Sequence, residues 1–478
     1  MTTGLRHPRS RRTFLKTTGT AGVGMIAMPA YVRGFMSRPP SAKMHVAFVG
    51  CGGKGSVHVN ELQHENMVAF CDVDEVRAAN TFSTFPKVPR YIDFREMLDE
   101  LHDQIDGVVI STPDHTHAVA TMASMQLGKH VYVEKPLTHN IAEGRALLKA
   151  AKRYGVVTQM GNQGASMDCN RDVREWIQAG VIGEVRTVHV WTNRPVWPQG
   201  VPTPTGKVAV PDTMQWDLWL GPAKWRDYHP AYAPFKWRGW WEFGTGAFGD
   251  MGCHLVDPAY RALKLTLPYA VEASATTVWV DDFVEANYPE SCPPSSYVKM
   301  NFPAREGMPE CTLFWYDGGL QPMRPEELKP EEPFGSWDGG VLFEGSAGKM
   351  VCGLFGEHAT LLPTTRMADF TPPPQTYERI KVSHQYNWVN ACKGDGVASS
   401  PFEYAVPLTE SLLIGNLAVR MYDRKKLQPG KKETDWAPFE YPGRTRLLYD
   451  ADSMRVTNLE EANTFISREY REGWMWKD

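Results

Sequence analysis

The chain has 478 residues, of which 42% are hydrophobic and 22% charged, as in a globular protein large enough for two domains or more. Its formal net charge of -4 argues against nucleic acid or an anionic membrane surface as a partner. Eight cysteines without a C-x-x-C pair predict neither a zinc site nor a disulfide framework.

The amino terminus has the features of a targeting segment. Ser10 to Lys16 reads SRRTFLK and precedes a mildly apolar, glycine-rich run that ends in small residues near Ala30. The run is too short to span a bilayer, and the pattern resembles a twin-arginine export signal. We expect residues 1–42 to be signal peptide and linker, the twin-arginine export machinery to be a partner, and the mature protein to be periplasmic. No later apolar run predicts a membrane span.

The next part of the chain alternates between short apolar runs and helix-like segments. The apolar runs begin at Lys43, Met67, Gly107, His130 and Val156. Apolar strands that alternate with amphipathic helices indicate a parallel sheet covered on both faces. We therefore expect a doubly wound α/β domain, the Rossmann fold, over residues 43–163.

From residue 164 to residue 478 the pattern changes. Segments of alternating polarity lie between long loops rich in proline and glycine, at 184–195, 269–280, 296–304 and 311–319. This alternation predicts antiparallel strands. We expect a substrate-binding α+β domain with a large, open, mostly antiparallel sheet, on which residues 426–478 pack back.

The first predicted strand ends in a G-x-G-x-x-G turn that opens a helix. Glycines there permit a tight turn and let the backbone approach a pyrophosphate at the helix N-terminus. Asp72 closes the second strand, where a carboxylate binds ribose hydroxyls and repels a 2′-phosphate. The turn predicts a dinucleotide site with NAD favoured over NADP, its glycines being Gly50, Gly52, Gly53 and Gly55.

Two polar loops follow later strands of the same predicted sheet, STPDHTH at 111–117 and VEKPLTH at 133–139. Ligands of such sheets bind outside the carboxyl ends of the strands, so both loops should border the nicotinamide. We expect further cofactor contacts from these loops and from the end of the fifth strand, namely Thr112, Pro113, His117, Glu134, Lys135 and Asn162.

An acid and an imidazole lie four residues apart in GDMGCH, at Asp250 and His254. If the segment is helical, the two side chains share one face. Together with Asp257 they could form a metal site, but no second His/Cys cluster is near, and we predict no metal. Pro258 should break or restart any helix that begins at Asp250.

Four motifs follow one another in the chain: the G-x-G-x-x-G turn, T-P-x-x-x-H (112–117), E-K-P (134–136) and D-x-x-x-H (250–254). Their order and spacing resemble the glucose-fructose oxidoreductase/inositol dehydrogenase/MocA (Gfo/Idh/MocA) family over most of residues 43–425. The resemblance implies that the open sheet of the second domain forms one wall of the substrate cleft, and that the protein is a homo-oligomer. It also implies that Lys135, Asp250 and His254 meet beside the nicotinamide as catalytic residues.

This set of side chains fits the chemistry of a dehydrogenase. Hydride leaves a carbinol carbon only as its hydroxyl loses a proton, so a base of near-neutral pKa is needed, and His254 is the natural candidate. Lys135 can donate to the same oxygen and stabilise its negative charge. Asp250 can orient the imidazole or bind a neighbouring hydroxyl. Whether Lys135 or His254 takes the proton stays open.

The substrate class is suggested by aromatic residues. Residues 191–241 contain half of the 16 tryptophans of the chain. Aromatic faces stack on sugar rings while nearby polar groups bind the hydroxyls, although we expect most of these rings to pack loops onto the sheet. We take Arg194, Trp241 and Glu242 as candidate substrate-binding residues.

Free nicotinamide cofactor is scarce outside the cytoplasm, so an exported enzyme should hold NAD tightly and restore it within its own cycle. We therefore expect an NAD(P)-dependent oxidoreductase that acts on CH–OH groups of a sugar or glycoside. One alternative is an NAD-dependent, redox-assisted glycoside hydrolase, a class also found in this family but with a different histidine motif. A second is a non-catalytic sugar-binding protein on the same fold, against which Lys135, Asp250 and His254 argue.

Overall fold

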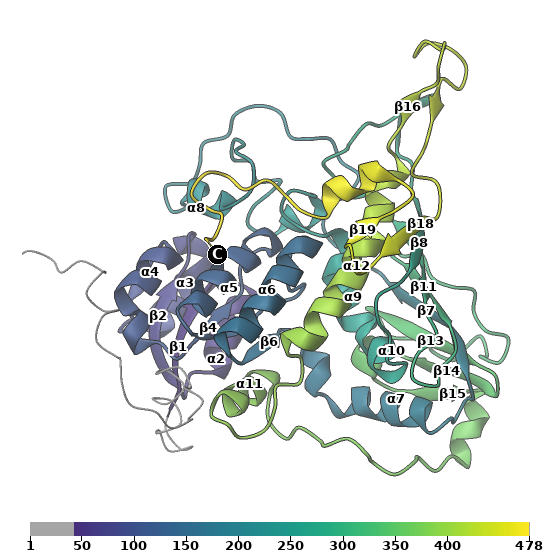
Figure 1. Ribbon diagram of the computed structural model, residues 1–478, viewed down its shortest axis with the longest axis horizontal. Coiled ribbons are helices and arrows are strands. Elements are labelled where there is room, and N and C mark those ends of the chain that lie inside the picture. The colour runs from purple at the N-terminus through teal and green to yellow at the C-terminus, as the bar shows by residue number, and fades with distance from the viewer. Residues whose placement is uncertain (1–42, 478) are drawn as a thin grey trace, which may run out of the picture. The chain divides into compact units, whose positions relative to one another are not determined.

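The computed structural model of the protein describes residues 43–477, so the predicted export signal lies outside the described residues. The order of the elements places a parallel sheet first and a larger mixed sheet second (Figure 1). This arrangement confirms the expected fold class. The domain boundaries expected after residues 42 and 163 stay predictions.

The first sheet has six parallel strands in the order β3-β2-β1-β4-β5-β6. Its central strands are buried along most of their length, as expected for a sheet with helices on its faces. The strands are β1 (His45–Val49), β2 (Asn66–Cys71), β3 (Arg90–Tyr91), β4 (Gly107–Ile110), β5 (His130–Val133) and β6 (Thr158–Met160). The helices that connect them are α2 (Lys54–Glu61), α3 (Glu75–Thr84), α4 (Phe94–Leu101), α5 (Asp114–Gln126) and α6 (Ile141–Tyr154).

The second sheet has nine strands in the order β15-β14-β13-β7-β12-β11-β8-β18-β19. Its pairs are antiparallel except for β7 and β12, and buried and half-exposed residues alternate along β11 and β12, so one face is covered. The strands are β7 (Val185–Thr192), β8 (Ala270–Ala275), β11 (Ser296–Phe302), β12 (Cys311–Tyr316), β13 (Gly339–Gly345), β14 (Gly348–Cys352), β15 (Thr360–Leu362), β18 (Leu447–Asp450) and β19 (Arg455–Val456).

The remaining helices lie mostly on the covered side of the second sheet, where the long α12 crosses β8 and β11 (Figure 1). They are α7 (Asp168–Gln178), α8 (Trp216–Leu220), α9 (Gly246–Leu255), α10 (Asp257–Ala262), α11 (His384–Cys392) and α12 (Phe402–Tyr422). Two small hairpins add β9 (Trp279–Asp281) with β10 (Val284–Glu285), and β16 (Lys426–Leu427) with β17 (Phe439–Glu440). Among the described residues, no helix combines the length and apolar character that a membrane crossing requires.

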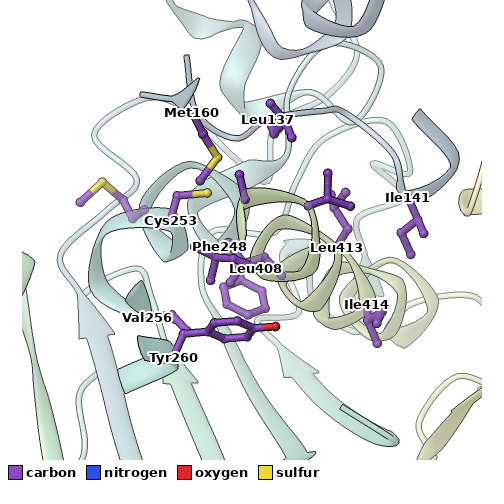
Figure 2. Packing of buried hydrophobic residues seen from close by; sticks show 14 of the residues in the cluster. Leu137, Ile141, Met160, Phe248, Cys253, Val256, Tyr260, Leu408, Leu413 and Ile414 are labelled. Atoms are coloured by element: carbon purple, nitrogen blue, oxygen red, sulfur yellow. The ribbon is translucent and has the colours of Figure 1, made fainter. Parts of the chain in front are cut away.

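The helix that carries Asp250 and His254 is held in the centre of the core. Figure 2 shows Phe248 and Cys253 of α9 beside Leu408 and Leu413 of α12, within one hydrophobic cluster that also includes residues of the first sheet. The helix ends at Leu255, and α10 restarts at Asp257 with Pro258 in its first turn, which confirms the expected break. Both functional side chains therefore lie on one rigid, buried helix.

Candidate functional site

A cavity of about 340 Å³ lies at the carboxyl ends of β1, β2, β4 and β5. From the parallel sheet it is lined by Gly50, Gly52, Asp72, Thr112 and Lys135, among others. Segments from elsewhere in the chain complete it with Trp219, Trp237, Arg238, His254 and Trp474. The cavity thus lies where doubly wound sheets bind their ligands.

The glycine turn forms one end of this cavity. Gly50 has a φ of 83°, and a Cβ there would lie 2.8 Å from the carbonyl carbon of Ser111, so only glycine fits. The turn leads into the N-terminus of α2, whose free N–H groups favour an anion. This turn of backbone at a helix N-terminus fits a dinucleotide pyrophosphate. Gly53 and Gly55 shape the turn but do not line the cavity.

Asp72 is held beside the turn at the end of β2. Its carboxylate accepts hydrogen bonds from the backbone N–H of Cys51 at 2.7 Å and of Gly52 at 3.2 Å. Burial raises the pKa of Asp72, although these bonds favour its ionised form. The side chain of Arg77, which was not identified from the sequence, lies against Gly52 and Gly53 and also lines the cavity. Asp72 is thus fixed where a ribose hydroxyl would be bound.

Some residues of the loops after β4 and β5 line the cavity, and others hold the loops together. Thr112 and Pro113 line the cavity, whereas His117 is buried, with its ring nitrogens 2.8 Å from the carbonyl oxygens of Thr112 and Pro136. His117 therefore ties the two loops together rather than facing the cavity. Glu134 lines the cavity and pairs with His58 at 2.8 Å.

The central contact of the site joins the two halves of the described chain. Lys135 Nζ donates to Oδ1 of Asp250 at 2.9 Å and to its backbone oxygen at 2.8 Å. Arg238 Nε, in the 3-10 turn η3 (Lys236–Gly239), donates to the same Oδ1 at 3.3 Å. Burial alone would raise the pKa of Asp250, but the two cations outweigh burial and hold it below its usual range. The structure thus brings Lys135 and Asp250 together, with Arg238 as a partner that no sequence motif revealed.

His254 lies one turn after Asp250 and lines the same cavity. Its ring meets Phe355 edge-on with centroids 5.1 Å apart, and its Nδ1 has no hydrogen-bond partner among the described residues. Burial and then the charge of Lys135 lower the pKa of His254 to about 3. The expectation of a near-neutral pKa is therefore wrong, because desolvation outweighs the attraction of Asp250. The imidazole is neutral at physiological pH and can accept a proton.

The three candidate substrate residues lie outside the cavity. Arg194 pairs with Asp338 at 2.8 Å, and Trp241 borders a separate small pocket. Glu242 accepts the backbone N–H of Lys224 at 2.8 Å. Their interpretation as substrate contacts is not supported by the geometry. The aromatic segment does reach the cavity, but through other rings, those of Trp219 and Trp237.

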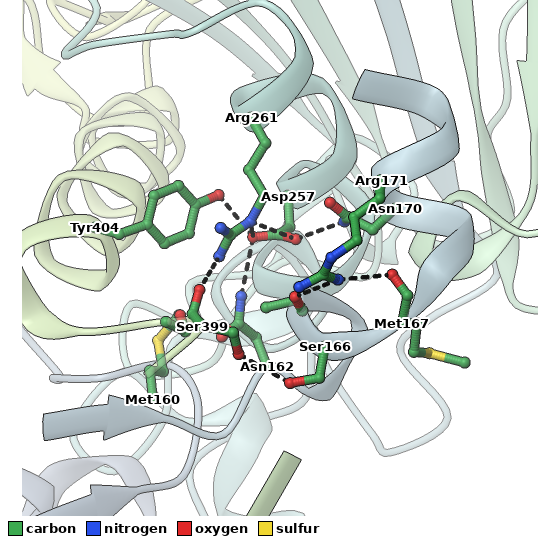
Figure 3. A network of polar contacts seen from close by, with 12 residues as sticks. Met160, Asn162, Ser166, Met167, Asn170, Arg171, Asp257, Arg261, Ser399 and Tyr404 are labelled. Atoms are coloured by element: carbon green, nitrogen blue, oxygen red, sulfur yellow. Dashed lines mark hydrogen bonds and ion pairs between the residues drawn. The ribbon is translucent and has the colours of Figure 1, made fainter. Parts of the chain in front are cut away.

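Asn162 belongs to a buried polar network rather than to the cavity lining (Figure 3). Its Nδ2 donates to Asp257 at 2.9 Å, and the same carboxylate accepts from Asn170, Arg261 and Tyr404. Asp257 thereby ties the loop after β6 to α7, α10 and α12. These bonds assign Asp257 a structural role. Among residues 43–477 no group of three or more His, Cys, Asp or Glu side chains could hold a metal ion.

Buried histidines predict a loss of stability in acid. Burial lowers the pKa of His115 and His254 to about 3 and that of His384 to about 4. Below pH 6.5 the unfolded chain binds protons that the folded protein excludes, so stability falls as the pH drops toward 4, by about 1.4 kcal/mol per pH unit for each histidine. We expect the urea midpoint of wild type to fall from about pH 7 to about pH 5. The fall should be less steep in His115→Asn. In the exposed control His64→Asn it should be as steep as in wild type. A midpoint independent of pH would contradict this assignment.

The comparisons with known proteins agree with this geometry. Residues 44–162 match the NAD-binding Rossmann fold of the Gfo/Idh/MocA oxidoreductase family, and residues 171–285 match its C-terminal alpha/beta domain. The WlbA dehydrogenase from Bordetella pertussis, solved in complex with NADH and UDP-GlcNAcA, superposes with a TM-score of 0.53 at 17% identity, over 79% of this chain and 96% of that chain.

Two curated relatives carry hydrolase names. A glycosyl hydrolase family 109 protein of Shewanella baltica (strain OS185) is 31% identical over 175 residues, and an alpha-N-acetylgalactosaminidase of Shewanella oneidensis has the same identity. Each match spans 31% of this chain and only 38% of the relative. Two consecutive regions of the chain thus match the Gfo/Idh/MocA oxidoreductase family, the first its NAD-binding Rossmann fold and the second its C-terminal alpha/beta domain.

Proposed function

We propose that the protein is an exported NAD(P)-dependent oxidoreductase that transfers hydride between a tightly held nicotinamide cofactor and a ring hydroxyl or ketone of a sugar or glycoside. The observation that carries the proposal is a single cavity that begins at the glycine turn and also contains Lys135 and the neutral imidazole of His254. NAD, when bound, supplies the acceptor for hydride.

Side chains of the protein bind the proton of the substrate hydroxyl and stabilise the charge left on its oxygen. The neutral imidazole of His254, which lines the cavity, can accept the proton of a substrate hydroxyl. The ammonium of Lys135 can stabilise the negative charge that develops on the oxygen. Asp250 holds this ammonium in place through two contacts and is itself held by Arg238. In the reverse direction the same groups return a proton to a ketone.

The substrate class rests on the aromatic wall. Trp219 and Trp237 border the cavity, and such rings stack on the C–H faces of a sugar. The name of one relative, an alpha-N-acetylgalactosaminidase, supports a carbohydrate ligand. Export rests on SRRTFLK alone, and we expect replacement of Arg11 and Arg12 by lysine to keep the protein in the cytoplasm.

Cofactor retention is the first test. The protein is purified without added nucleotide and denatured, and the supernatant is assayed separately for NAD(H) and NADP(H). We expect stoichiometric NAD(H), because an enzyme outside the cytoplasm has no free pool from which to replace it. An empty supernatant would overturn the tight retention on which the proposed cycle depends.

A redox-assisted glycoside hydrolase is the second candidate, favoured by the names of the 31% identical relatives. Oxidation, elimination, hydration and reduction would then leave no net redox change. Release of a chromogenic aglycone without an external acceptor would decide for the hydrolase. Stoichiometric reduction of the bound nicotinamide by a sugar, with no bond cleavage, would decide for the oxidoreductase.

A further inference from the structure

Asp114 is a buried carboxyl group that lines the cavity, and the sequence motifs did not single it out. It begins α5 and is 2% exposed, yet it lines the cavity together with Lys135, Arg238 and His254. Its Oδ2 accepts a hydrogen bond from Oγ1 of Thr245 at 2.9 Å. A carboxyl group that is buried and yet lines a ligand cavity together with two cations calls for a functional explanation.

The bond to Thr245 connects the two halves of the site. Thr245 directly precedes α9, the helix that carries Asp250 and His254, and its carbonyl oxygen accepts from Asn416 of α12 at 2.8 Å. Asp114 lies on the other side, as the first residue of α5, directly after the loop that follows β4. The Asp114–Thr245 bond therefore fixes the start of α9 against the loop that borders the cofactor.

The charges around Asp114 are nearly balanced. Burial and the neighbouring Asp250 raise the pKa of Asp114 to about 7, while two cations and Thr245 favour its ionised form. Asp250 keeps a low pKa and His254 stays neutral. Asp114 is thus the member of this group whose charge changes near neutral pH. The groups that face it are Asp250, Cys253 and His254 of α9, Arg238 of η3, Lys135 after β5, and the buried thiol of Cys292.

We propose that Asp114 is a positioning residue of the proposed reaction, which holds α9 through Thr245 and adjusts, by its own charge, how strongly Lys135 is drawn to Asp250. The proposal rests on the proposed function. When Asp114 is neutral, Lys135 has one carboxylate partner and faces the substrate oxygen with little competition. When Asp114 is ionised, a second anion attracts both cations and repels the alkoxide that forms. Proton transfer from the substrate is therefore favoured by the neutral form.

The pH profile of the chemical step tests the proposal. In wild type we expect the single-turnover rate of nicotinamide reduction by a sugar to fall as the pH rises through about 7. Asp114→Asn should lack this step. Thr245→Val, which loses the donor that favours the ionised form, should move the step to higher pH, whereas Thr245→Ser should leave it in place. Persistence of the step in Asp114→Asn would overturn the inference.

A stability measurement separates this inference from the proposed function. Between about pH 4 and 7 the folded protein keeps the proton of Asp114 that the unfolded chain loses, so the contribution of this one group to stability falls as the pH rises through that window, against the opposite effect of the buried histidines. Asparagine cannot titrate. We expect the thermal midpoint of Asp114→Asn, relative to wild type, to rise from about pH 5 to about pH 8. A difference in thermal midpoint that stays the same at every pH would overturn the inference, even if the protein reduces no nicotinamide. If the difference rises as expected in a protein that reduces no nicotinamide, only the proposed function is wrong.

Discussion

Replacing Lys135 by methionine is expected to lower the single-turnover rate of nicotinamide reduction by a sugar about 10²–10³-fold, the effect of losing one donor to a developing oxyanion. Replacing His254 by asparagine should lower it about 10²–10⁴-fold, because the proton acceptor is lost. The physical reason lies in the cavity, which is lined by both Lys135 and the neutral imidazole of His254. Stopped-flow absorbance of the bound nicotinamide measures both rates.

Two comparisons keep this result interpretable. Lys149→Met, on the exposed side of α6, removes the same charge far from the cavity lining and should leave the rate unchanged. Nucleotide content after purification should be the same in the two site variants as in wild type, which shows that the fold is intact. If both site variants reduced nicotinamide at the wild-type rate, the catalytic assignment would be wrong. An inactive wild type that still binds sugar would favour the non-catalytic alternative.

The first sheet and the glycine turn are predictable from the sequence because their causes are local. Each parallel strand is a short apolar run that ends before a turn, and the turn needs glycine where φ is positive, as at Gly50. The carboxylate of Asp72 follows from the same local pattern, since it directly closes β2. Local periodicity also placed Asp250 and His254 on one helix face.

The second sheet is less predictable because its pairing joins distant segments. β13 begins with two glycines and has few polar residues to show alternation, and it was missed, as were β14 and β15. β18 comes from near the end of the chain, yet it pairs with β8 in the sheet. The parallel pairing of β7 with β12 has no sign in either segment alone.

The same limit explains the errors at the site. Arg238 and Asp114 reach the cavity through tertiary contacts with α9, and no spacing rule connects them to Asp250. The low pKa of His254 is a consequence of burial, which a motif does not reveal. Arg194 was chosen for its aromatic surroundings, yet its nearest anion, Asp338, holds it away from the cavity.

The carboxyl-terminal segment from Ile466 to Lys477 crosses from the second sheet to the first (Figure 1, yellow). Tyr470 donates to Glu143 of α6 at 2.7 Å, and Arg471 Nε donates to the backbone oxygen of Gly221 at 2.9 Å. These contacts bring Trp474 to the cavity, where its ring packs beside Phe94 with centroids 6.3 Å apart. The segment therefore holds α8 and closes part of the cavity wall.

Trp474→Ala is expected to make the protein lose its nucleotide about 10- to 100-fold faster during dialysis, because the buried contact of one large aromatic side chain is worth about 1.5–3 kcal/mol. A chain that ends at Ile466 should lose it faster still, since the anchors at Tyr470 and Arg471 are removed as well. The measurement is the nicotinamide nucleotide left per chain after timed dialysis, with Met475→Ala as the control because that exposed neighbour does not line the cavity.

Nucleotide retention and the rate of nicotinamide reduction should respond in opposite ways in the catalytic-site variants and in the tail variants. Lys135 and His254 variants should keep the nucleotide and lose the reaction, whereas Trp474→Ala should lose the nucleotide and recover the reaction when excess NAD is added. Equal retention by Trp474→Ala and wild type would show that the tail only packs on the surface of the first sheet. If the protein works outside the cytoplasm as proposed, it needs slow dissociation of the nucleotide more than fast association. A wall segment anchored to α6 and to the end of α8 would slow the release of a bound nucleotide, because the segment must move before a large ligand can leave.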